Sequence, residues 1–157
     1  MIKELGDFTA SLKSRLNIGQ DLKVEGPYGH FDFNDSAAQL WIAGGIGIAA
    51  FTAILQQRQT MNNPPKAILY YCSDTLEPKL IEELQQLSSS SEVELRIIDN
   101  SRHALLSAEQ LVNEVADLMQ RKIWFCGPVA FSSNLQQQLA HYRYPLKHFH
   151  SELFELR

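Results

Sequence analysis

One stretch, Leu40-Trp-Ile-Ala-Gly-Gly-Ile-Gly-Ile-Ala-Ala-Phe-Thr-Ala-Ile-Leu55, restricts the possible folds of this chain more than any other. Its apolar start predicts a buried strand over Leu40–Ala43. A glycine-rich turn over residues 44–47 follows, and the next apolar residues predict a helix from Ile48 to about Gln59. A strand that passes through a tight turn into a helix is the first half of a βαβ unit.

The turn itself has the residues of an anion-binding site. Gly44, Gly45 and Gly47 let the backbone bend tightly, and they let an anionic group approach main-chain N–H donors because no Cβ intervenes. Those donors lie at the positive end of the helix dipole, which favours phosphate. Gly45-x-Gly47-x-x-Ala50 also fits the G-x-G-x-x-G/A pattern of dinucleotide-binding turns. The alternative is a glycine-rich turn that binds nothing.

Apolar strands alternate with amphipathic helices along the rest of the chain. Further strands are predicted at Ala67–Cys72, Val93–Ile98, Lys122–Cys126 and Leu146–His150. Helices are predicted from about Leu76 to Leu87, from a capping box at Ser107–Gln110 to Met119, and from Gly127-Pro128 to Tyr142, with a loop at Ser88–Ser91. This alternation predicts an α/β fold, a five-stranded parallel sheet with helices on both faces. The strand order expected for this sheet is 3-2-1-4-5.

Small and polar residues gather where these strands end. In doubly wound sheets, ligands bind beyond the carboxyl ends of the strands, near the point where the strand order reverses. The segments expected at that edge are residues 44–47, 72–75, 99–103, 126–128 and 151–152. The sequence therefore predicts a binding site built from several strand ends.

Composition excludes several other classes of function. The 157 residues suffice for one domain and an appendage, and the net charge of −4 gives no basic surface for nucleic acid. No apolar run approaches the ~18 residues that span a bilayer, so we expect no membrane contact by this chain. His148 and His150 share a predicted strand, but no third ligand has metal spacing. Two cysteines indicate a reducing, cytoplasmic compartment.

Residues 1–35 lack the regular alternation of apolar strands and amphipathic helices that the rest of the chain shows. A short helix over residues 7–16 and two short strands over residues 22–25 and 30–33 are predicted there. Two such strands cannot stand alone, so they are expected to end a β domain that lies upstream of Met1.

Four segments together resemble the ferredoxin–NADP reductase superfamily, and more closely its ferric-reductase and respiratory-burst-oxidase-like branch. They are Val24-Glu-Gly-Pro-Tyr-Gly-His-Phe31, Ile42-Ala-Gly-Gly-Ile-Gly-Ile-Ala-Ala-Phe51, Trp124-Phe-Cys-Gly-Pro128 and Phe149-His-Ser-Glu-Leu-Phe-Glu-Leu-Arg157. The resemblance implies that residues 1–35 are the C-terminal end of an FAD-binding β-barrel and that residues 36–157 are an NAD(P)-binding domain. The family's Arg-x-Tyr-Ser/Thr flavin signature is absent, so this chain alone is not expected to retain FAD.

The resemblance also implies a role for each matched residue. Gly44, Gly45, Ile46 and Gly47 would hold the pyrophosphate, and Cys126, Gly127 and Pro128 would lie over the nicotinamide and its ribose. Glu152 resembles the near-terminal acid beside the nicotinamide, which makes Cys126 and Glu152 the catalytic candidates, as positioning contacts and not as a nucleophile and a base. Tyr28 and Phe154 would lie near the flavin, and Cys72, Ser73, Asp74 and Arg102 near the nucleotide's ribose.

Several of these residues have simpler alternatives. Cys72 fits a core thiol, Asp74 fits a helix cap completed by Glu77, and Arg102 fits a solvated loop. The sequence also departs from the family, which usually has proline where Ala49-Ala50 stand, a second phenylalanine where Leu156 stands, and arginine where Ser73 stands. Losing that arginine weakens contact with a 2′-phosphate, which favours NADH over NADPH, although Arg102 leaves NADPH open.

The implied function is hydride delivery from NADH or NADPH to FAD for onward electron transfer, with an upstream FAD domain and a transmembrane haem domain as candidate partners. Such a protein would be cytoplasmic or lie on the cytoplasmic face of an inner-membrane protein. A nucleotide-binding regulatory module without redox activity is the alternative. A stand-alone dehydrogenase is disfavoured, because the chain has no acid–base constellation and no second domain to hold a substrate.

Overall fold

The computed structural model describes residues 11–12, 14–21, 23, 31, 33 and 37–154. Its centre is a five-stranded parallel sheet in the order β3-β2-β1-β4-β5. The strands are β1 (Gln39–Gly44), β2 (Ala67–Ser73), β3 (Val93–Asp99), β4 (Lys122–Pro128) and β5 (Phe149–Phe154). The strand order predicted from the sequence is confirmed.

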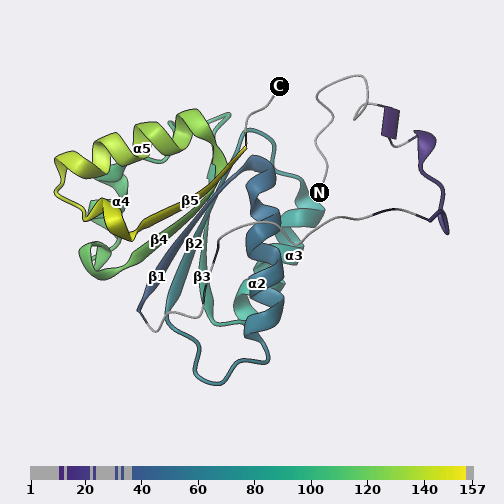
Figure 1. The fold of residues 1–157 in the computed structure, drawn as a ribbon, viewed down its shortest axis with the longest axis horizontal. Coiled ribbons are helices and arrows are strands. Elements are labelled where there is room, and N and C mark those ends of the chain that lie inside the picture. The colour runs from purple at the N-terminus through teal and green to yellow at the C-terminus, as the bar shows by residue number, and fades with distance from the viewer. Residues whose placement is uncertain are drawn as a thin grey trace.

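Helices cover both faces of the sheet. They are α2 (Ile48–Arg58), α3 (Pro78–Ser90), α4 (Ala108–Glu114) and α5 (Val129–His141), with short 3-10 turns η1 (Gly45–Gly47), η2 (Leu118–Gln120) and η3 (Leu146–His148). Figure 1 shows α2 and α3 on one face and α4 and α5 on the other. None of the helices in the described part of the chain is long and apolar enough to cross a membrane.

The two faces of the sheet bury separate apolar clusters. Alternate residues of β1 show the division, because Leu40 and Ile42 join the cluster under α4 and α5 while Trp41 and Ala43 join the one under α2 and α3. Every residue of β1 and β2 is buried. Strands covered on both faces need continuous apolar runs, which explains why these two strands were predicted almost to the residue.

The fifth strand differs from the prediction. β5 begins at Phe149, and residues 146–148 form η3, in which the His148 N–H donates to the carbonyl of Pro145 at 2.8 Å. The strand then runs on to Phe154, four residues beyond its predicted end at His150. His148 and His150 therefore do not share a strand. Pairing with β4, which itself extends to Pro128, holds this polar segment in the sheet.

Two helix boundaries were also mispredicted. α3 starts at Pro78 with Glu77 as its N-cap and no side-chain cap bond, so the predicted Asp74 capping box is wrong. Proline disfavours the helical conformation in the residue before it and suits the first helical position, which fixes the start at Pro78. The predicted loop at residues 88–91 is instead the end of α3, with Ser91 as its C-cap, and the Ser90 hydroxyl donates back to the carbonyl of Gln86 at 2.9 Å.

The helix after Ser107 is shorter than predicted. The Ser107 side chain does accept from the Gln110 N–H, but the Gln110 side chain donates to Glu114 and does not complete the box. α4 ends at Glu114, and Met119, expected to point inward, is exposed.

The predicted elements of residues 1–35 fall largely outside the described residues. Residues 11, 12, 14 and 15 are helical, as the predicted helix requires. The two predicted strands lie outside the described residues apart from Lys23, Phe31 and Phe33, and so does Tyr28.

Candidate functional site

The strand order reverses next to β1, which has β2 on one side and β4 on the other. α2 leaves the end of β1 toward one face, and α5 leaves the end of β4 toward the other (Figure 1). The two diverging connections leave the strand ends accessible at this point, where doubly wound sheets bind their ligands. The glycine turn and the Cys126–Pro128 segment therefore lie together at the edge predicted for the site.

The glycines of the turn have two different tasks. A Cβ added to Gly47 would lie 2.1 Å from the carbonyl oxygen of Cys126, and one added to Gly44 would lie 2.8 Å from Cδ of Pro128. The close approach is mutual, because a Cβ added to Gly127 would lie 3.1 Å from Cα of Gly44. These three glycines let the turn after β1 pack against the end of β4.

Gly45 is different. Its φ is +54°, which L side chains rarely adopt, and a Cβ placed there would meet no protein atom within 4 Å. Space therefore lies open beside the backbone at Gly45. Gly47, the N-cap of α2, offers no side chain to the N–H groups of the first helical turn. The combination suits an anionic group that approaches the main chain.

Cys126 and Glu152 are neighbours across β4 and β5, where the register pairs them directly. Both are half-buried and lie on the sheet face that carries α2. Burial, with a smaller contribution from the Glu152 charge, raises the pKa of the Cys126 thiol to about 11. The thiol is therefore protonated near neutral pH, which agrees with a positioning contact and not with a thiolate nucleophile.

The ends of β2 and β3 form the outer part of the edge. The Ser73 hydroxyl donates to the carbonyl of Thr75 at 2.8 Å, and Asp74 is exposed. Nε of Arg102 lies 3.4 Å from Oδ2 of Asp99, and the Ser101 hydroxyl donates to Oδ1 of the same carboxylate. The bond from the Ser101 hydroxyl is the main reason why the pKa of Asp99 is lowered.

Cys72 lies in the apolar core, and burial raises the pKa of its thiol to about 12. Phe154 ends β5, but its side chain lies outside the described residues. Among the described residues, no group of three or more His, Cys, Asp and Glu side chains is arranged to hold a metal ion.

Sequence reasoning missed two buried polar residues of the scaffold. Gln39 is fully buried at the start of β1, and its side chain donates to the carbonyl of Phe33. Arg58 is also buried, with its guanidinium 5.4 Å from the Trp41 ring and donating to the carbonyl of Pro65 at 2.8 Å. The contacts that bury them come from segments distant in sequence, so periodicity gave no signal for either residue.

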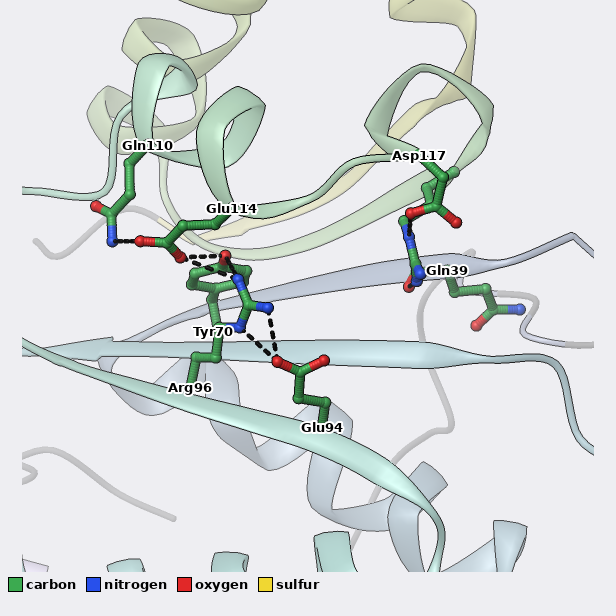
Figure 2. A network of polar contacts seen from close by, with 8 residues as sticks. Gln39, Tyr70, Glu94, Arg96, Gln110, Glu114 and Asp117 are labelled. Atoms are coloured by element: carbon green, nitrogen blue, oxygen red, sulfur yellow. Dashed lines mark hydrogen bonds and ion pairs between the residues drawn. The ribbon is translucent and has the colours of Figure 1, made fainter.

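A polar network lies on the opposite face of the sheet, away from Cys126 and Glu152. Figure 2 shows Arg96 between Glu94 and Glu114, with the Tyr70 hydroxyl donating to Glu114 at 2.7 Å. These contacts fasten α4 to β2 and β3. The network explains how a seven-residue helix is held on the sheet, and it belongs to the scaffold.

The strand order and the helices on both faces define a doubly wound α/β domain. Among solved structures, the chain resembles the FAD/NAD-binding domain of nitric oxide dioxygenase from Vibrio cholerae, with a TM-score of 0.78, 20% identity, and coverage of 95% of this chain and 65% of that one. It also resembles ferredoxin–NADP+ reductase from Plasmodium falciparum, with a TM-score of 0.71, 17% identity, and coverage of 95% and 65%. At these identities the likeness shows the fold.

Sequence comparison points to the same group. The chain is 30% identical over 157 residues to the anthranilate 1,2-dioxygenase electron transfer component of Acinetobacter baylyi, covering 91% of this chain and 44% of that protein. No family model matches the chain. The chain spans less than half the length of the curated relatives it matches.

The chain is thus similar in sequence to an oxygenase electron transfer component, and similar in fold to ferredoxin–NADP+ reductase and to the FAD/NAD-binding domain of nitric oxide dioxygenase.

Proposed function

We propose that this chain is the NAD(P)H-binding domain of a flavin-dependent oxidoreductase, which delivers hydride from nicotinamide to FAD for onward electron transfer. One observation carries the proposal: the turn at the strand-order reversal is packed by Gly44 and Gly47 and is open at Gly45. A turn built only for packing would not need a left-handed residue beside open space. A nucleotide's pyrophosphate fits there, against the main chain and the first turn of α2.

The residues at the neighbouring strand ends fit the rest of a dinucleotide. Cys126 and Glu152 lie side by side beyond the turn, and a bound nicotinamide there would supply the hydride. The neutral thiol would pack against the ring without attacking it, and the carboxylate would orient the ring by accepting a hydrogen bond from its carboxamide. Both residues would act by alignment, which is the main protein contribution to hydride transfer.

The outer edge supports a preference for NADH. Ser73 brings no cation to the end of β2, and the exposed Asp74 would accept from an unphosphorylated ribose. Arg102 is 80% exposed and lies beside Asp99, whose charge offsets its own. A 2′-phosphate would therefore gain less from Arg102 than from a cation without an acidic neighbour.

The finer assignments belong to this proposal as well. Residues 1–35 would be the C-terminal end of an FAD-binding β-barrel and residues 36–157 the nucleotide domain. The four matched motifs favour the ferric-reductase-like branch, with an upstream FAD domain, a transmembrane haem domain and a position on the cytoplasmic face of the membrane. The relatives' names instead mention oxygenase reductases and flavohemoproteins, so these are the competing electron acceptors.

Titration of the 157-residue chain with NADH and with NADPH tests nucleotide binding. Tighter binding of NADH is expected; equal affinity would remove the NADH preference, and no binding of either would refute the proposed function. Flavin reduction in the complete protein, followed by stopped flow, then separates a reductase from a regulatory module. Cys126→Ala and Glu152→Gln should slow flavin reduction more than they weaken NADH binding, whereas Glu83→Gln, an exposed charge change on α3, should alter neither.

A further inference from the structure

The sheet face that carries Cys126 and Glu152 is covered differently on its two halves. α2 packs on β1, and α3 packs on β3. Over β4, the described side chains that meet Trp124 from this face include Phe31 and Phe33, which come from the segment before the sheet. These two residues, named here the strap, complete the layer that the helices begin.

The strap is fixed by aromatic packing. The ring centroid of Phe31 lies 5.4 Å from that of Trp124 and 6.0 Å from that of Phe51. Phe33 lies 5.4 Å from Trp41 and 5.3 Å from Trp124. Three aromatic partners, one from each of β1, α2 and β4, therefore hold two residues that precede the sheet in sequence.

Two hydrogen bonds anchor the strap at opposite ends of the sheet. The Phe31 N–H donates to Oε1 of Glu152 at 3.1 Å, near the carboxyl end of β5. The Phe33 carbonyl accepts from Nε2 of Gln39 at 3.1 Å, at the amino end of β1. Gln39 is fully buried, and its Oε1 accepts from the Trp41 indole N–H at 2.8 Å, so its amide is held from both sides.

We infer that Glu152 couples nucleotide binding to the strap: the carboxylate that faces the nicotinamide side of the site also holds the main chain of Phe31. The inference rests on the proposed function. A carboxylate has about four acceptor positions, so it accepts the Phe31 N–H and a nucleotide donor together. A bound nucleotide orders the carboxylate and thereby strengthens the strap anchor. Because coupling is reciprocal, loss of the anchor weakens nucleotide binding by the same factor.

The Gln39 anchor is an internal control. It holds the same strap at the opposite edge of the sheet, and its partners are Phe33 and Trp41. Its bond to the strap should therefore be insensitive to the nucleotide. Glu152 acts on the upstream part of the chain through the strap, as a positioning residue in addition to its contact with the nicotinamide.

Amide hydrogen exchange at Phe31, measured by NMR on the 157-residue chain with and without saturating NADH, tests the inference. Without nucleotide, Glu152→Ala should speed exchange at Phe31 by about tenfold or more, since a hydrogen bond to a charged group is lost. Glu152→Gln should have a smaller effect, because the amide oxygen still accepts. NADH should slow exchange at Phe31 severalfold in the parent chain and leave the Gln39 side-chain amide protons unchanged.

A second measurement tests reciprocity. Phe31→Ala and Phe31→Pro both remove the ring, and only the proline variant also removes the N–H donor. The NADH dissociation constant of Phe31→Pro should exceed that of Phe31→Ala by the same factor by which NADH slows exchange at Phe31. If the proline variant has a lowered thermal midpoint, a double-mutant cycle replaces the direct comparison: Glu152→Ala should weaken NADH binding less in the Phe31→Pro background than in the Phe31→Ala background, by that same factor.

The outcomes distinguish the inference from the function beneath it. If the chain binds no nucleotide, the proposed function fails and the coupling fails with it, whatever Phe31 exchange shows. If NADH binds but Phe31 exchange is unchanged or faster, or Glu152→Ala leaves it unaltered, the coupling is wrong and the proposed function stands.

Discussion

Replacing single glycines of the turn with alanine should separate its packing task from its binding task. A Cβ on Gly47 would lie 2.1 Å from the Cys126 carbonyl oxygen and 2.6 Å from its carbon, both main-chain atoms that cannot rotate away. Ordinary contact would require β4 and the turn to part by more than about 1 Å. We therefore expect Gly47→Ala to cost about 3 kcal/mol, the upper part of the range for overpacked cores.

Gly45→Ala should behave differently. The left-handed conformation costs an L residue about 1–2 kcal/mol, and the stiffer unfolded chain returns about 0.4–1 kcal/mol. The free energy of unfolding should therefore fall by about 1 kcal/mol or less, because the added Cβ meets no protein atom within 4 Å. The new methyl group would nevertheless stand in the open space where the pyrophosphate is proposed to lie. NADH affinity should fall tenfold or more in a chain that remains folded.

Urea unfolding followed by tryptophan fluorescence measures the stability of both variants, because Trp41 and Trp124 are buried in the same cluster. For a chain of this size, 3 kcal/mol corresponds to a fall of roughly 6–12 °C in the thermal midpoint. Equal losses of stability in the two variants would refute the assignment of different tasks. Normal NADH binding by Gly45→Ala would show that the pyrophosphate does not bind at this turn.

Three further predictions concern single side chains. Arg58→Leu should lower the free energy of unfolding by about 2 kcal/mol in urea, because the partly buried Pro65 carbonyl loses its donor; an unchanged midpoint would show that water replaces the guanidinium. The Tyr70 hydrogen bond lowers the pKa of Glu114, so its stabilisation is full above the ordinary value of 4.5 and is lost as pH falls through the lowered pKa. The thermal midpoint of Glu114→Gln should therefore fall less than that of the parent chain as the pH is lowered from roughly 6 to 3. Equal falls in the two midpoints would contradict this. Iodoacetamide should alkylate Cys126 slowly at neutral pH, and faster in Glu152→Gln, because the acid's charge helps to raise the thiol pKa to about 11; equal rates would show that burial alone sets it.

The strands were predictable because their signal is local. A strand buried on both faces needs a continuous apolar run, and Leu40–Ala43 and Ala67–Cys72 have one. β5 has weaker apolar character at its end, so its start and end were misplaced. Its position depends on hydrogen bonds to β4, which no pattern within residues 146–157 encodes.

The sequence by itself determined the architecture and the strand ends that form the candidate site. Alternating strands and helices leave few topologies, and the glycine turn marks the strand end where the order reverses. The tertiary structure alone decided which glycine does what, since Gly44 and Gly47 pack against β4 and Gly45 faces open space. It also brought Phe31 to Glu152 across 121 positions of the chain. Periodicity records which face of an element is buried, but the partner on that face is chosen only when distant segments pack together.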